Sequence, residues 1–227
     1  MIYEILKKRQ HVYEYDMDQI PDRRIIKNLL YKTWEITPSK QNIMPYKVSV
    51  VGPDNFETKQ KIYNKVVGNH RKMEDEGEKQ GYIKKASNKI NPHYRHVLYN
   101  PYLIVFSQRV CSDKDINPFY KRKMEEGHFM EQVHEEYVKR IKGSTAIEVG
   151  LFAQNFASFC LEKDIDHSFT VCFPGDKEDW KDIPFAEQPV LLLMSIGKAK
   201  TYRRDFLVQS SSDQDYKTAF GNVVHFE

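Results

Sequence analysis

Thr37-Pro38-Ser39-Lys40-Gln41-Asn42-Ile43-Met44-Pro45-Tyr46 joins a helical pattern to a strand pattern. The two prolines restrict φ, so the backbone cannot be helical here. Between them, Ser39, Gln41 and Asn42 offer hydrogen-bond donors and acceptors. A rigid polar loop at a helix-to-strand junction is a common place for binding groups, although the same residues also suit a loop that only ends a helix.

On the N-terminal side of this loop, apolar spacing predicts a short helix over 2–9, an extended segment over 10–16 and a helix over 22–36. The last of these has one apolar stripe, made of Ile25, Ile26, Leu29, Leu30 and Trp34. After the loop we expect a strand over 46–51 and a second helix over 56–67.

Farther along, two continuous apolar runs at 102–107 and 189–197 predict buried strands, and a shorter strand is expected at 169–173. A helix that is apolar on much of its circumference is expected from 144 to 163, with Ser144 as its N-cap.

The whole chain, 1–227, is predicted to form a single α+β domain in which one sheet is covered by helices. Two polar segments, at about 74–98 and 108–142, interrupt the pattern and predict exposed insertions.

Composition narrows the class of protein. The net charge of +3, from 35 basic and 32 acidic side chains, favours neither a nucleic-acid surface nor a polybasic membrane surface. Three cysteines without a C-x-x-C pair predict a reducing compartment. The longest apolar run, 190–196, has the length of a strand and is too short to span a bilayer. We therefore expect a cytoplasmic protein.

Two basic clusters lie near opposite ends of the chain, one at Lys8-Arg9 and the other over 198–204. Together they suit a phosphate site, because arginine binds phosphate with two parallel hydrogen bonds; each alone also suits a solvated surface. Glu131-x-x-His134 has the spacing of a di-iron ligand pair, but that architecture needs two such motifs, so no metal site is expected.

Arg9-x-His11-x-Tyr13-x-Tyr15-Asp16, followed by the 22–36 helix and by Pro38-Ser39-x-x-Asn42-x-Met44-Pro45-Tyr46, resembles the flavin-dependent nitroreductase family. That family typically opens with R-x-S-x-[RK]-x-[FY] and continues with P-S-x-x-N-x-Q-P-W before a strand. Asn69-His70-Arg71-Lys72-Met73 is similar to an N-x-R-K-M stretch in some members. The resemblance covers most of the chain and is weakest over 74–98 and 108–142.

The resemblance implies a nitroreductase-like fold with a mostly antiparallel sheet, and a homodimer that binds FMN at its interface. The implied phosphate ligands are Arg9, in the same block as Gln10, and Arg203 or Arg204. His11 stands where a serine usually bonds the phosphate or ribityl chain, and Tyr13 where Lys or Arg usually faces the pyrimidine edge of the ring. The remaining implied cofactor contacts are Pro38, Ser39 and Asn42 from the partner subunit, Asn69 and Lys72 at the polar edge of the ring, and the turn with Pro174 and Gly175 near N5.

The implied activity is ping-pong transfer of electrons from NAD(P)H through FMN to a small organic acceptor such as a nitroaromatic or a quinone. A cation near N1 and the C2 carbonyl favours reduced flavin, and Lys72 is the candidate for that charge. Two alternatives remain. One is a relative that uses FMN for reductive dehalogenation or flavin breakdown, and the other is a flavin-binding protein without turnover, suggested by the replacements at His11 and Tyr13.

Overall fold

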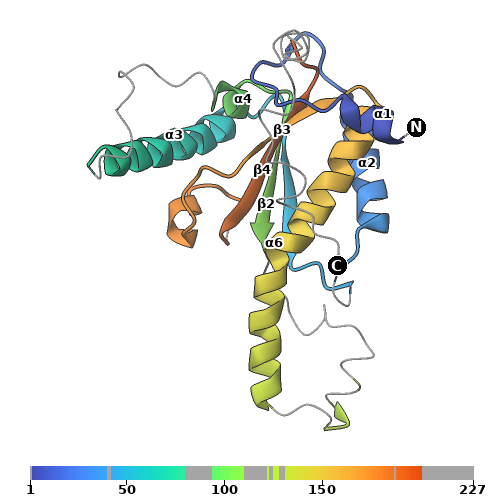
Figure 1. Cartoon of the computed structure of the whole chain (residues 1–227), viewed down its shortest axis with the longest axis vertical. Coiled ribbons are helices and arrows are strands. Elements are labelled where there is room, and N and C mark those ends of the chain that lie inside the picture. The colour runs from blue at the N-terminus through green and yellow to red at the C-terminus, as the bar shows by residue number, and fades with distance from the viewer. Residues whose placement is uncertain are drawn as a thin grey trace, which may run out of the picture.

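A four-stranded antiparallel sheet forms the centre of the protein in this computed structural model, with helices against both of its faces (Figure 1). The structure describes residues 2–39, 42–79, 94–109, 122, 125–127, 131–186 and 188–200. The strand order is β1-β2-β4-β3, so β1 and β3 are the edges of the sheet. The elements are α1 (Ile2–Lys7), α2 (Arg23–Ile36), β1 (Tyr46–Val51), α3 (Phe56–Lys79), α4 (Arg95–Leu98), β2 (Tyr102–Gln108), α6 (Glu131–Glu162), β3 (Asp166–Thr170), the 3-10 helix η4 (Lys177–Trp180) and β4 (Val190–Gly197).

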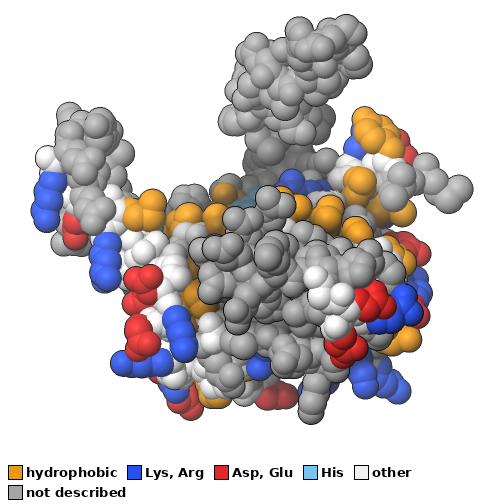
Figure 2. Space-filling model, turned by 90° about the horizontal axis from the view of Figure 1, so that it is seen from below, with side chains coloured by type: hydrophobic (Ala, Val, Ile, Leu, Met, Phe, Trp, Pro, Cys, Tyr) orange, Lys and Arg blue, Asp and Glu red, His pale blue; other side chains and the backbone are white. Residues whose placement is uncertain are grey.

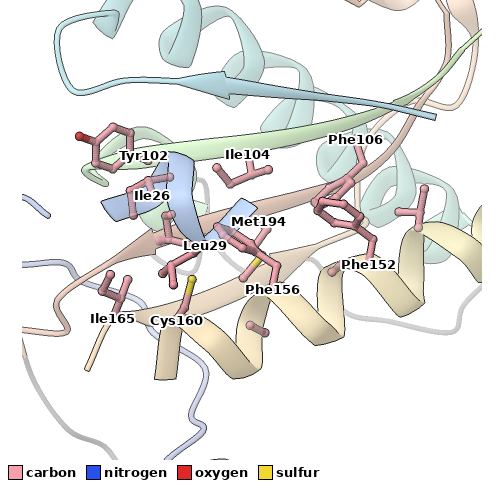
Figure 3. Close-up of a cluster of buried hydrophobic side chains, with 14 of the residues drawn as sticks. Ile26, Leu29, Tyr102, Ile104, Phe106, Phe152, Phe156, Cys160, Ile165 and Met194 are labelled. Carbon is pink, nitrogen blue, oxygen red and sulfur yellow. The ribbon is translucent and has the colours of Figure 1, made fainter. Parts of the chain in front are cut away.

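Strand β2 is buried along almost its whole length because helices cover both of its faces. Its residues alternate between two apolar clusters. Ile104 and Phe106 join a cluster built with α2 and α6 (Figure 3), whereas Leu103 and Val105 join one built with α3 and α4. The predicted strands at 46–51, 102–107 and 189–197 are thus confirmed, and the continuous apolar runs are explained by burial on both faces.

Helix α2 begins at an N-cap, where the Asp22 carboxylate accepts from the backbone N–H of Arg24 at 2.7 Å. It ends where Thr37 turns extended before Pro38. The buried face is narrower than predicted: Ile26 and Leu29 are buried, but Ile25 is 44% and Trp34 51% exposed. The buried line follows positions i, i+3 and i+7, and both exposed residues lie off it.

The prediction that Ser144 starts a helix was wrong, because α6 runs without interruption from Glu131 to Glu162. The residues before Ser144 are mostly good helix formers, so the serine is an interior position. Strand β3 also lies three residues earlier than the predicted 169–173. Its first residues, Asp166 to Ser168, are polar and yet buried, which no apolar pattern could signal.

A buried lysine ties α3 to the chain after α4. The Lys59 ammonium donates to the carbonyls of Asn100 at 2.6 Å and Pro101 at 3.2 Å, and the residue is 1% exposed. Burial lowers the pKa of Lys59 to about 8. This contact holds the start of α3 beside the chain that follows α4.

Helices with the length and apolar character of a membrane span are not found in the described part of the chain. Seen from below (Figure 2), basic and acidic side chains are interspersed around the described surface. Neither sign of charge dominates this face, in keeping with the small net charge.

We predict that Gly197→Ala lowers the free energy of unfolding by about 2–3 kcal/mol, because a small-to-large change in a packed site forces its neighbours apart. A methyl group at Gly197 would lie 2.5 Å from Cδ of Pro101, whose ring is rigid, and 3.0 Å from the ring of Tyr15. Urea unfolding measures the difference. Gly68→Ala is the control of opposite sign: nothing lies within 4 Å of the added methyl group, and loss of a helical glycine should stabilise the protein by up to about 1 kcal/mol. Equal stability of the two variants would contradict the packing at Gly197.

Candidate functional site

The N-terminal segment after α1 runs beside the edge strand β3. The backbone N–H of Val12 donates to the Ser168 hydroxyl at 2.6 Å, and that hydroxyl donates back to the Val12 carbonyl at 2.7 Å. Nearer α1, the Lys8 ammonium pairs with the Asp164 carboxylate at 3.2 Å. These contacts span more than 150 residues of sequence, and they set Arg9 to Tyr13 along this edge of the sheet.

The same segment then pairs with the chain that follows β4. The backbone N–H of Asp16 donates to the Lys198 carbonyl at 2.8 Å, and that of Lys200 donates to the Glu14 carbonyl at 3.0 Å. Residues 14–16 therefore form an antiparallel contact with 198–200, in accord with the extended segment predicted over 10–16. The stretch from 201 on, with the candidates Arg203 and Arg204, lies outside the described residues.

Five rings gather where the N-terminal segment meets α3 and α4, and we call them the ring cluster. The ring centroids of His11 and Tyr13 are 4.6 Å apart, and those of His11 and His96 are 5.2 Å apart. Tyr94 links His96 to His70 on α3, with centroid distances of 6.5 and 5.1 Å. The fold thus brings together rings from three separate parts of the sequence.

His96 is buried, at 2% exposed, and its Nε2 lies 2.8 Å from the Thr170 hydroxyl at the end of β3. The prediction of an exposed insertion over 74–98 was wrong for this histidine, because α4 lies over the sheet instead of projecting into solvent. The tautomer of His96 decides whether its Nε2 donates to the Thr170 hydroxyl or accepts from it. The contact connects the ring cluster to the end of β3, just before the turn that carries Pro174 and Gly175.

Asn69 and Lys72 lie on α3, which extends well past the predicted end at 67. Asn69 is half-buried next to His70, and its amide contacts the Met73 sulfur at 3.7 Å. Lys72 is exposed, three positions along the helix. Asn69 precedes His70 in the chain, but successive side chains of a helix point about 100° apart, so the place of Asn69 in the site stays a prediction.

The turn after β3 is anchored to the α3 side of the sheet. The Trp180 indole N–H donates to the Pro174 carbonyl at 2.9 Å, and the rings of Phe173 and Trp180 meet edge to face at 5.5 Å. Gly175 is exposed, and an added Cβ would have no neighbour within 4 Å. Trp180 is fully buried, so it holds this turn against the core and leaves open backbone at Gly175.

The 37–46 loop is held by a bond within itself and by a bond to α6. Its Ser39 hydroxyl accepts from the backbone N–H of Met44 at 2.8 Å, and the Asn155 amide on α6 donates to the Thr37 hydroxyl at 3.2 Å. Asn42 and Met44 both have positive φ, 57° and 48°. Asn42 is exposed, whereas Met44 packs against the α2–α6 cluster. The start of the loop is therefore bonded to α6 through Thr37, and the role of Pro38, Ser39 and Asn42 across a dimer interface stays a prediction.

His167 on β3 is a residue that the sequence reasoning missed. It is 2% exposed, and neither ring nitrogen has a hydrogen-bond partner among the described residues. Burial is the largest cause that lowers the pKa of His167, to about 4, and the nearby Arg9 and His11 lower it further. The only signal in the sequence was a histidine between two polar residues, in a stretch that did not look like a strand.

We predict that stability falls by about 2 kcal/mol between pH 7.5 and pH 5 because of His167. Its pKa rises from about 4 in the folded protein to 6.5 in the unfolded chain, so the unfolded chain gains the proton first as the pH falls. The loss begins near pH 6.5 and levels off below pH 4. Urea unfolding across this range measures it. The buried Asp166 titrates as well, so the comparison is with His167→Gln, whose curve should be flatter by that amount. Parallel curves would show that the histidine is already charged in the folded protein.

Groups of three or more metal-ligating side chains are not found among the described residues. The described part of the site combines the Arg9 cation, imidazoles and aromatic rings with the buried Asp166 carboxyl, which lies close to Gln10.

Comparisons with known proteins found similarity in structure and none in sequence. No family model matches the chain, and no curated protein matches it in sequence. Similar solved structures include a provisionally assigned NAD(P)H:FMN oxidoreductase from Staphylococcus epidermidis, with a TM-score of 0.64 and 16% identity over 100% of this chain and 96% of that one. A nitroreductase family protein from Streptococcus pneumoniae has a TM-score of 0.59 and 16% identity, with all of both chains covered. A provisionally assigned nitroreductase from Exiguobacterium sibiricum, in complex with FMN, has a TM-score of 0.63 and 15% identity over 100% of this chain and 97% of that one. This protein has the nitroreductase fold.

Proposed function

We propose that the protein is an FMN-dependent oxidoreductase of the cytoplasm that takes electrons from NAD(P)H and passes them to a small organic acceptor such as a nitroaromatic or a quinone. The observation that carries the proposal is the agreement in fold along the entire chain, with one similar structure in complex with FMN and another assigned as an NAD(P)H:FMN oxidoreductase. An enone reductase is also among the similar structures, which is in keeping with a reductive chemistry.

The residues at the β3 edge fit the phosphate of FMN. Arg9 is exposed and permanently charged, and His11 is exposed beside it. His167 is buried nearby, and neither of its ring nitrogens has a partner among the described residues. Its pKa of about 4 keeps the ring neutral, so its one N–H could donate to an anion. Gln10 lies between them, close enough to Asp166 to lower the pKa of that carboxyl. This donor set would hold a dianionic phosphate better than a neutral group.

The ring cluster and α3 would hold the planar part of the cofactor. Tyr13 and His11 offer ring edges and faces, and Asn69 offers an amide donor and acceptor. Lys72 would supply positive charge to the polar edge of the ring, and Arg203 or Arg204 would complete the phosphate contacts. Bound FMN supplies the hydride and electron transfer itself. This chain's residues bind it, orient it and set the charge around it.

A homodimer is part of the proposal, because the loop with Pro38, Ser39 and Asn42 would act on the cofactor of the partner subunit. In keeping with this, the start of the loop is bonded to α6 through Thr37. Exposed apolar side chains on α2 and α6, such as Ile36 at 58% and Ile147 at 67%, are also typical of a subunit contact.

The visible spectrum of the purified protein tests the proposal. A bound yellow chromophore, present on purification or acquired on adding FMN, is the expected result, followed by anaerobic bleaching with NADH or NADPH. Absence of flavin binding would exclude the whole proposal. Bound flavin that neither nicotinamide bleaches would leave a flavin-binding protein without this reductase activity.

A further inference from the structure

Arg109 directly follows β2 and binds three successive residues of the 37–46 loop. Its backbone N–H donates to the Pro45 carbonyl at 3.0 Å, which extends the antiparallel β1–β2 pairing by one residue. Its side chain turns back along the loop, where Nε donates to the Met44 carbonyl at 3.1 Å and Nη2 donates to the Ile43 carbonyl. One residue at the end of a central strand therefore binds three consecutive carbonyls.

The strand end that carries Arg109 is itself held from both sides. The preceding residue, Gln108, pairs with Tyr46 on β1, and its backbone N–H donates to the Pro189 carbonyl at 2.9 Å, just before β4. The guanidinium presents its donors in a fixed plane, so it can bind two neighbouring carbonyls at the same time. Ile43 is buried, and the carbonyls of buried residues need such donors.

Two residues of the loop have left-handed backbone angles and have to be held there. Asn42 has a φ of 57° and Met44 a φ of 48°. Asparagine tolerates this conformation, because its short polar side chain can bond locally. Methionine has no such group, so Met44 keeps the conformation only under constraint from its surroundings. The bond from Arg109 to the Met44 carbonyl is such a constraint.

Met44 also connects Arg109 to Ser39. The backbone N–H of Met44 donates to the Ser39 hydroxyl at 2.8 Å, and that of Asn42 donates to the Ser39 carbonyl at 3.0 Å. The Met44 N–H takes one lone pair of the hydroxyl, so the Ser39 O–H can still donate to a ligand. Ser39 and Asn42 are the loop side chains proposed to contact FMN. A shift of Met44 would therefore move both of them.

We propose that Arg109 is a positioning residue, which holds the 37–46 loop in its cofactor-binding conformation through the Ile43 and Met44 carbonyls. Arg109 acts through the loop and needs no contact of its own with the cofactor. The role given to Arg109 rests on the proposed function, because the loop contacts are contacts to FMN. The conformation of the loop can be measured without flavin, so the two can fail separately.

Amide hydrogen exchange of the full chain without flavin tests the hold on the loop. Arg109→Met keeps a long side chain that cannot donate, and the Met44 amide should then exchange about tenfold faster. The amides of β2 and β4 should keep their rates, because the sheet does not depend on the guanidinium. Arg109→Lys, which keeps the charge without the planar pair of donors, should fall in between.

FMN binding, followed by quenching of flavin fluorescence, tests the effect on the cofactor. Arg109→Met should weaken binding about tenfold, and Arg109→Lys should weaken it less. Adding Met44→Gly to Arg109→Met should recover part of the affinity, because glycine adopts positive φ without strain. A merely structural role predicts the opposite, since Met44→Gly also removes a packed side chain. Arg23→Met, at an exposed position of α2, is the control and should change the Kd less than twofold.

An unchanged Kd for Arg109→Met, in a chain that binds FMN, would overturn the role of Arg109 and leave the proposed function standing. Faster exchange throughout β2 and β4, or a further loss of affinity on adding Met44→Gly, would also overturn it, because either result indicates general destabilisation. If the unsubstituted chain binds no FMN, the proposed function fails and the role of Arg109 fails with it.

Discussion

Phe156→Ala is expected to lower the free energy of unfolding by about 4 kcal/mol, as large-to-small changes of a buried phenylalanine typically cost 3–5 kcal/mol. Phe156 is 0% exposed on α6, in the middle of the cluster that joins this helix to α2 and the sheet (Figure 3). Phe152 precedes it by one turn and Cys160 follows by one turn, both also buried. These neighbours belong to a helix that is fixed over several turns, so they cannot collapse into the space left by the ring.

Urea unfolding with a common m-value measures this loss. Gln154→Ala is the matched control on the same helix: the side chain is exposed, and its amide reaches only the Ser158 hydroxyl at 3.5 Å. Its effect should stay within about 0.5 kcal/mol. A loss under about 1.5 kcal/mol for Phe156→Ala would mean that α6 does not pack on the sheet through this residue.

Arg9→Ala is expected to weaken FMN binding between about tenfold and a hundredfold. A hydrogen bond to a charged group contributes roughly 1.5–3 kcal/mol, and arginine can make two such bonds to one phosphate. Arg9 is exposed at the end of α1, so its replacement should leave the fold intact. Quenching of FMN fluorescence on titration with protein gives the Kd. The double variant with Arg204→Ala should lose most of the remaining affinity.

Lys7→Ala is the control for Arg9→Ala, because it removes the same charge from α1. The Lys7 ammonium is already engaged with Glu4 and with the ring of Tyr3. Its loss should change the Kd less than twofold, an effect of net charge alone. If Arg9→Ala and Lys7→Ala bind FMN equally well, Arg9 is not a phosphate ligand, even if the protein remains a flavoprotein.

Local patterns of the sequence predicted much of the fold. The strands 46–51, 102–107 and 189–197 and the helix 22–36 were predicted within a residue or two of their bounds. Each is bounded by a proline, a turn or a capping residue and carries an apolar pattern of one period, both of which are local properties. The α+β class followed from the same elements, and the structure confirms it.

Local patterns failed where burial depended on distant segments. Ser144 has the chemistry of an N-cap, but the chain before it continues as a helix. Strand β3 begins with Asp166, His167 and Ser168, which look like a loop in the sequence. They are buried because the N-terminal segment lies along them and bonds to Ser168, about 156 residues away in the chain.

The sequence by itself determined the class of fold and the order of most elements, because periodicity and turn signals are properties of neighbouring residues. The candidates Arg9, Ser39, Asn42 and Asn69 came from the resemblance to the nitroreductase family and stay predictions. Only the tertiary structure decided which of these candidates meet. It brought His11 and Tyr13 to His96, buried His167 without a hydrogen-bond partner among the described residues, and left the Tyr46 hydroxyl unpaired in a cleft. The physical reason is that hydrogen-bond satisfaction and burial depend on which segments pack together, and in this chain those segments lie far apart in sequence.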